Sequence, residues 1–390
     1  NFSQIKNILT LFNLENNYFT NINLIADLKT NIDFEINNKF KIKNLKYSIK
    51  GVINQLKLNN KENKVIKKYL PEFNSKIILK ETNVNFINSK SLYSIELNGL
   101  VKIKDKFDKF NIKEIYNSQN KSYNITGMID LTNLKVEIPN LNYIKDNKEK
   151  SELIFDTNFV TNKQYNIKEL IFSANKTKIN LRGIKLNKNF ETTDFENLEI
   201  KTFSNKIKNN DFLIKKSKKI VISGEVFDAQ PLLKSLYKKS DKKTFSKNFN
   251  SEVAINFNKM LTGTDDLVSN FTMIASINKG SYTKISSKGN FSANEIIEMS
   301  IYQIDKDKKT LQVISDRARP FVKHFDFIKG FEGGKLEYES IISKQFSNSN
   351  LIITDFKVSK VPALAQLLTL ASLQGIADTL SGEGIRFESF

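Results

Sequence analysis

The stretch Tyr93-Ser-Ile-Glu-Leu97 shows the pattern that runs through this sequence. Apolar side chains at Tyr93, Ile95 and Leu97 alternate with polar ones at Ser94 and Glu96. Successive side chains of an extended chain point to opposite faces, so this segment has one apolar face and one polar face. The stretch therefore predicts a β-strand that is buried on one side only.

The same alternation recurs along most of the chain. We expect its apolar members, with those of the first stretch, to line one apolar groove that binds lipid: Leu134, Val136, Ile138, Val253, Ile255, Phe257, Leu311 and Val313. Clusters of Asn, Asp, Lys and Gly at 59–63, 104–108 and 305–309 separate such runs and suit hairpin turns. We therefore expect a mostly antiparallel sheet, with strand above about 45% of residues and helix below about 20%.

Two segments interrupt the strands with helical spacing. In residues 228–239, Pro231 suits a first helical turn and leucines follow at helical intervals. In residues 362–380, leucines and alanines cover more than one face, which indicates a helix buried against a sheet or capping it. A further short helical turn is expected near Arg319–Phe325.

Composition excludes several classes of function. The 390 residues include no Cys and one His, which removes thiol nucleophiles, disulfides and histidine-rich metal sites. The net charge of +19 would suit nucleic acid, but only four of the 61 basic residues are arginine, the residue that specific base and phosphate recognition favours. We expect no enzymatic activity, no cofactor, no metal and no nucleic-acid partner.

The number of one-faced strands limits the possible architectures. A compact sandwich usually holds about seven to ten strands, and this chain predicts roughly twenty or more. The sheet must therefore close on itself, wind as a solenoid, or curl into a long trough whose apolar side is filled by something else. Acyl chains are a filler that fits an apolar trough with a lysine-rich exterior.

Five ordered segments point to one of these architectures. They are SGEVFDAQPLL (223–233), LQVISDRARP (311–320), GFEGGKL (330–336), ITDFKVSKVPALAQLL (353–368) and TLASLQGIADTLSGEGIRF (369–387). In this order they resemble the C-terminal region of the AsmA-like proteins of Gram-negative bacteria, specifically the YhdP type. Gln230 stands where that pattern has arginine. The resemblance covers about residues 220–390, and residues 1–219 match only as repeated strands.

The resemblance implies a fold, a location and a function. The fold is an elongated, twisted β-sheet curled into an apolar groove, with a few short helices near the C-terminus. The function is non-enzymatic transport of phospholipid between the inner and outer membranes; a periplasmic scaffold for assembly of outer-membrane proteins is the alternative. Residues of the motifs to which we assign structural roles are Asp228, Pro231, Asp316, Gly333, Gly334, Pro362, Leu367, Gly375, Gly382 and Gly384.

The resemblance also divides the chain into two regions and implies a longer native protein. Residues 1–219 would form a repetitive groove segment, and 220–390 an AsmA-like C-terminal region truncated at its end. We expect Gly330, Gly333 and Gly334 to form a turn with positive φ. The family is periplasmic and anchored in the inner membrane, so we expect the native protein to extend beyond both ends, with a membrane helix before Asn1.

Overall fold

The protein is built mainly from β-strands. The computed structural model describes residues 19–60, 64–89, 91–160, 163–235, 248–305, 308–323, 329–343, 347–360 and 385–389. Strands hold 71% of these residues, and their α-helices are three short segments. The expected fold class and proportions are confirmed, and 21 of the described strands belong to one large twisted sheet.

The chain divides into two compact units. Unit 1 comprises residues 1–139 and 143–198, and unit 2 comprises residues 140–142 and 199–390. Residue 219, the end of the first region in the sequence analysis, lies within unit 2, between two strands that pair from Asp211↔Val226 to Lys216↔Ile220.

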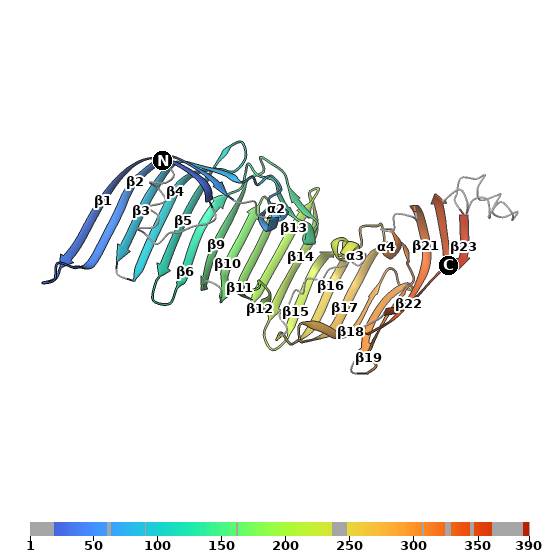
Figure 1. Ribbon diagram of the computed structural model, residues 1–390. Helices are drawn as coiled ribbons and strands as arrows, with labels where there is room; N and C mark the ends of the chain where they lie inside the picture. The colour runs from blue at the N-terminus through green and yellow to red at the C-terminus, as the bar shows by residue number, and fades with distance from the viewer. Residues whose placement is uncertain are drawn as a thin grey trace. The chain divides into compact units, whose positions relative to one another are not determined.

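Unit 1 is a succession of antiparallel strands that lie side by side in chain order (Figure 1). A connection with one short helix, α2 (Lys64–Tyr69), joins β2 to β3 where a plain hairpin was expected at 59–63. The strands are β1 (Phe19–Ile36), β2 (Ile42–Asn60), β3 (Lys76–Ser89), β4 (Leu92–Lys102), β5 (Phe107–Asn117), β6 (Ser122–Asp130), β9 (Ser151–Val160), β10 (Gln164–Ala174), β11 (Thr177–Asn187) and β12 (Thr192–Asp194).

One small hairpin of unit 1 stays outside this sheet. β7 (Val136–Ile138) and β8 (Tyr143–Lys145) pair only with each other among the described strands, around a short 3-10 turn, Pro139–Leu141, whose last two residues belong to unit 2. Leu134, Val136 and Ile138 alternate as the sequence predicts. They belong to this hairpin and the turn before it, and not to a strand of the main sheet.

Unit 2 continues with strands in chain order, but one neighbouring pair is parallel. Its elements are β13 (Asn197–Ser204, whose first two residues belong to unit 1), β14 (Ile207–Lys216), β15 (Ile220–Asp228), α3 (Gln230–Ser235), β16 (Ser251–Leu261), β17 (Leu267–Asn278), β18 (Ser281–Asn290), β19 (Ile296–Gln303), β20 (Lys309–Ser315), α4 (Arg319–Val322), β21 (Lys329–Ile342), β22 (Ser347–Lys360) and β23 (Ile385–Ser389).

One parallel pair interrupts the mostly antiparallel sheet that the sequence predicts. β15 and β16 run in the same direction from Ile220↔Val253 to Asp228↔Leu261. Their connection begins with α3. Because the pair is parallel, β16 must begin at the same end of the sheet as β15. The sheet is therefore mixed. Helices α3 and α4 lie where the sequence predicts helix, although α3 is described only to Ser235.

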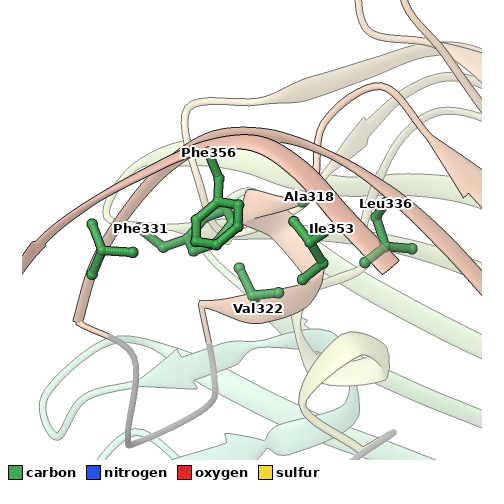
Figure 2. Packing of buried hydrophobic residues seen from close by; sticks show 7 residues of the cluster. Ala318, Val322, Phe331, Leu336, Ile353 and Phe356 are labelled. Carbon is green, nitrogen blue, oxygen red and sulfur yellow. The ribbon is translucent and has the colours of Figure 1, made fainter. Parts of the chain in front are cut away.

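A small core closes one end of the β21–β22 hairpin (Figure 2). Ala318 and Val322 of the α4 segment pack against Leu336, Ile353 and the stacked ring pair Phe331–Phe356, whose centroids are 5.0 Å apart. The Ala318 amide donates a hydrogen bond to the Gly334 carbonyl, with N and O 2.7 Å apart. This bond ties the helix to the strand.

The glycines of GFEGGKL have positive φ, as predicted, but they lie inside β21 and do not form a turn. φ is +72° at Gly330, +67° at Gly333 and +79° at Gly334. A Cβ on Gly334 would lie 2.9 Å from Phe356 Cβ and 3.3 Å from Ala318 Cβ, whereas one on Gly333 would meet nothing closer than 3.5 Å. Gly334 therefore allows α4 to approach the sheet, and Gly333 supplies only backbone freedom.

We predict that Gly334→Ala destabilises the protein more than Gly333→Ala. Both alanines would adopt positive φ, which costs about 1–2 kcal/mol for a residue with a Cβ. Only the first would also force apart Phe356 and Ala318, and overpacking of this kind costs about 1–3 kcal/mol more. Urea unfolding of the two variants measures the difference. Equal losses would show that the α4 contact does not depend on the missing Cβ.

Candidate functional site

Unit 1 carries an apolar face that extends across its consecutive strands. The pairing register sets its members: Leu97 of β4 lies opposite Val84 of β3 and Ile112 of β5. Tyr93 and Ile95, from the stretch that sets the sequence pattern, lie on the same face. The face continues through residues that oppose one another on β6, β9, β10 and β11, namely Ile125, Ile129, Leu153, Phe155, Ile167, Leu170, Leu181 and Ile184.

The opposite face of unit 1 is polar and its charges are paired across strands. Lys113 on β5 binds Glu96 on β4 with N and O 2.5 Å apart, and Arg182 on β11 binds Glu169 on β10 at 2.8 Å. These pairs are solvent-exposed and each stabilises the sheet by only about 0.2–1 kcal/mol. The pairs identify the face of the sheet that lies in water.

One end of the apolar face is covered. Leu79, Val101 and Phe110 are buried there with Ile103 and Ile129 packed against them. Further along the sheet, the β7–β8 hairpin lies over β10, where the Tyr143 ring packs edge-on against Phe172 with centroids 6.0 Å apart. At this end the apolar face is part of an ordinary protein core.

The covering hairpin is held by a buried lysine. Lys145 is fully buried, and its ammonium donates to three backbone carbonyls, those of Leu131 at 2.7 Å, Thr132 at 3.1 Å and Leu134 at 2.7 Å. Burial lowers the pKa of Lys145, because the charged form loses hydration. Leu134 and Val136, expected to line the groove, are buried within this cover, at 2% and 5% exposure.

The other end of the apolar face is open and bordered by aromatic rings. Tyr93, Tyr116 and Tyr123 lie opposite one another on β4, β5 and β6, and their neighbours extend the series on both sides. Adjacent ring centroids are 4.5 to 5.9 Å apart along the whole series. We call these eight residues the aromatic row: Tyr47, Phe86, Tyr93, Tyr116, Tyr123, Phe159, Tyr165 and Phe190.

Sequence reasoning found only Tyr93 of this row. The signal for the others was the position of the rings relative to the turns. Tyr116 and Tyr123 flank one hairpin turn symmetrically, and Phe159 and Tyr165 flank the next, so hairpin register places each pair opposite one another. Pairing the strands around their turns, rather than reading each strand alone, would have found the row.

A carboxyl group interrupts the apolar character of this face. Glu114 lies two residues from Tyr116 on β5, and its Oε1 accepts a hydrogen bond from the Tyr93 hydroxyl, with the oxygens 3.3 Å apart. Burial raises the pKa of Glu114 above its ordinary value of 4.5, and the bond from Tyr93 offsets part of that rise. Among the described residues no Lys or Arg forms an ion pair with Glu114.

Unit 2 carries an apolar face of the same kind. Val253, Ile255 and Phe257 share one side of β16, as predicted, and Val253 and Phe257 are buried while Ile255 is half-buried. They lie opposite Ala275, Met273 and Phe271 of β17. Further along the sheet, half-buried Leu311 and Val313 of β20 lie opposite Ile301 and Met299 of β19.

The motif residues that the structure describes have structural contacts. Asp228 Oδ1 accepts a bond from the Gln230 amide at 3.1 Å, which caps α3, while its Oδ2 accepts from Asn142 Nδ2 at 2.8 Å. Pro231 lies in the first turn of that helix. Asp316 Oδ2 accepts from the Ile296 amide at 2.8 Å. Pro362, Leu367, Gly375, Gly382, Gly384 and the helix expected at 362–380 lie outside the described residues.

The hollows of the surface lie mostly on the polar side. One of about 440 Å³ in unit 2 is lined by polar-face residues of β17 to β20, including Thr272, Lys288, Glu298 and Gln312. Within the described part of the chain, no group of three His, Asp or Glu side chains is placed to hold a metal ion. The helices described here include none that is long and apolar enough to cross a bilayer.

Comparison with known proteins adds no relative. No family model, curated protein or solved structure matches the chain. The resemblance to AsmA-like proteins therefore stays a prediction that rests on the ordered motifs of residues 223–387.

We predict that the stability difference between Glu114→Gln and the wild type depends on pH. Since the folded-state pKa of Glu114 is raised, its contribution to stability is full below 4.5 and is lost as pH rises through the folded-state pKa. The amide that replaces the carboxyl group does not titrate, so Glu114→Gln should match the wild type near pH 4 and exceed its stability at pH 8. Thermal unfolding between these values measures the effect.

Glu96→Gln is the control, because it lies on the polar face of the adjacent strand. Its hydrogen bond with Lys113 lowers the pKa of Glu96, so the carboxylate stabilises the fold above 4.5 and this contribution is lost as pH falls through the folded-state pKa. Glu96→Gln should therefore be less stable than the wild type at pH 8. A Glu114→Gln difference that does not change with pH would contradict the burial of that carboxyl group.

Proposed function

We propose that the apolar faces of this protein hold phospholipid acyl chains and that it carries phospholipid between the inner and outer membranes of a Gram-negative envelope, without chemical reaction. The observation that supports this proposal is the open apolar face of unit 1, whose apolar residues lie opposite one another from strand to strand. The motifs of residues 223–387 support the periplasmic location and the inner-membrane anchor that the resemblance implies.

The energetics favour an apolar occupant. Burying apolar surface contributes about 25 cal/mol per Å², and each methylene removed from water contributes about 0.8 kcal/mol. Side chains on the face remain exposed even though they point to the apolar side, as in Leu28 at 44% and Ile32 at 58%. An acyl chain laid on such a face would remove water from both partners.

Uniformity of the face suits movement along it. Neighbouring strands are spaced about 4.8 Å apart, and each presents another set of aliphatic side chains at the same level. A lipid that shifts by one strand exchanges one set of apolar contacts for an equivalent set. Dispersion contacts have no directional requirement, so such steps break no hydrogen bond of the acyl chains.

We predict that Ile255→Asp reduces lipid occupancy and that the adjacent Asn256→Asp does not. Ile255 is half-buried on the apolar face, and a carboxylate there would lie among acyl chains, at a cost on the order of several kcal/mol. Asn256 points to the exposed polar face, where a charge stays hydrated. Native mass spectrometry of each purified protein, looking for bound phospholipid, measures occupancy.

The control separates loss of binding from loss of fold. Far-UV circular dichroism should show the same strand content in both variants. Equal lipid occupancy in Ile255→Asp and Asn256→Asp would contradict the proposed role of this face. Wild-type protein that carries no phospholipid and takes none up from vesicles would favour the scaffold for outer-membrane proteins instead.

A further inference from the structure

The aromatic row has a distinct position on the apolar face of unit 1. Far from it, the face is closed by the core around Phe110 and by the β7–β8 hairpin over Phe172. Beyond the row, turns follow at 37–41, 117–122 and 187–191, and β9 ends at Val160 opposite the start of β10 at Gln164. The row therefore separates the aliphatic part of the face from the edge at which these strand ends lie.

The rings of the row lie face to face with their neighbours or tilted against them. Successive planes in the row are inclined by only 10 to 43° at centroid distances that correspond to stacking. Stacked faces are unavailable to a sugar ring or a nucleobase, which would need a free aromatic face. What the row offers is a continuous hydrocarbon border with phenol hydroxyl groups, and Glu114 beside Tyr93.

Lysines without ion-pair partners line the turns next to the row. All five are exposed, and none forms an ion pair with another described residue: Lys39, Lys41, Lys121, Lys163 and Lys188. At the opposite edge, Lys104 binds Glu72 at 2.6 Å and Lys145 is buried on carbonyl oxygens, while Lys106 and Lys176 are exposed. The open edge thus presents positive charge that suits a phosphate group.

The three layers follow the order of a membrane interface. Aliphatic side chains such as Leu97 and Ile112 lie inward, tyrosines lie at the border, and lysines lie outward. Tyrosine is enriched at bilayer interfaces because its ring is apolar and its hydroxyl needs a polar partner, and lysine is attracted to anionic headgroups.

We propose that the aromatic row fixes the depth of a glycerophospholipid on unit 1, with acyl chains across the aliphatic residues, glycerol esters at the tyrosines and the phosphate toward the turn lysines. This assignment rests on the proposed function and adds the orientation of the lipid to it. The phenol hydroxyl groups of the row other than that of Tyr93, which donates to Glu114, supply donors for ester carbonyl oxygens. The lysines hold the headgroup outside, so lipids progress along the sheet in one orientation.

Depth-dependent quenching tests the orientation, because the chain contains no Trp and single-Trp variants are therefore unambiguous. Tyr116→Trp lies in the row, and Ile112→Trp lies on the same face four residues inward, about 14 Å along the strand. Each variant is loaded with phosphatidylcholine that carries a nitroxide either on the headgroup or in the middle of an acyl chain. Tyr165→Trp and Leu170→Trp on β10 repeat the comparison should either β5 variant fail to fold.

The headgroup label should remove more indole emission in Tyr116→Trp, and the mid-chain label should remove more in Ile112→Trp. Bound lipid with the reverse order, or with no difference between labels, would overturn the assignment and leave lipid binding intact. Absence of bound lipid by mass, with no quenching by either label, would overturn both the assignment and the proposed function.

Charge reversal tests the lysines separately. Lys121→Glu with Lys163→Glu should lower affinity for phosphatidylglycerol by about thirtyfold or more, since each lysine near an anionic headgroup contributes about 1 kcal/mol and two are lost. Lys106→Glu with Lys176→Glu, exposed lysines in turns at the opposite edge, is the matched control and should change it by less than about twofold. Equal losses from both pairs would show that the headgroup does not lie at the row.

Discussion

The rest of the structure depends on keeping the apolar side chains of every strand on the same face as those of its neighbours. Side chains alternate with a period of two, so a slip of one residue in any pairing would turn a whole strand over. Leu97 lies opposite both Val84 and Ile112, and the same agreement holds from strand to strand through unit 1. Register is thus the property that makes a continuous apolar face from many short segments.

Where an extra residue shifts the alternation of apolar and polar positions, a β-bulge keeps the apolar side chains on the same face. On β10 the apolar positions run Tyr165, Ile167 and then Leu170, with one extra residue between the last two. The pairing shifts at that point, from Ile167↔Thr157 to Leu170↔Phe155, so Leu170 returns to the apolar face. A bulge leaves the extra residue outside the ladder and bends the strand, so phase changes in the sequence become local twist in the sheet.

The sequence predicted what alternation determines and missed what depends on distant partners. Tyr93, Ile95 and Leu97 share a face because neighbouring residues along one strand decide that. Whether an alternating segment joins the main sheet depends on its surroundings, and Leu134 to Ile138 instead cover the sheet because Lys145 fixes their turn through three carbonyl oxygens. The direction of β16 depends likewise on a connection whose path no local pattern specifies.

Polar groups and glycines on the apolar faces follow the same constraint. Thr82 is fully buried, and its hydroxyl is satisfied within its own strand by the Lys80 carbonyl at 3.1 Å. It lies against Gly99, whose missing Cβ leaves room for that side chain. The glycine thus leaves room for a buried side chain of the neighbouring strand to pack closely.

Binding to such a face depends on the sheet as a whole more than on any single residue. An enzyme's pocket depends on a few groups converging at one point, whereas here the same contacts recur at each strand and removing one leaves its neighbours. The exceptions are the groups that break the repetition, Glu114 among aliphatic side chains and the tyrosines at the border. Because dispersion contacts are alike along the face, the orientation of an amphipathic ligand depends on these polar groups and on the lysines of the turns beyond them.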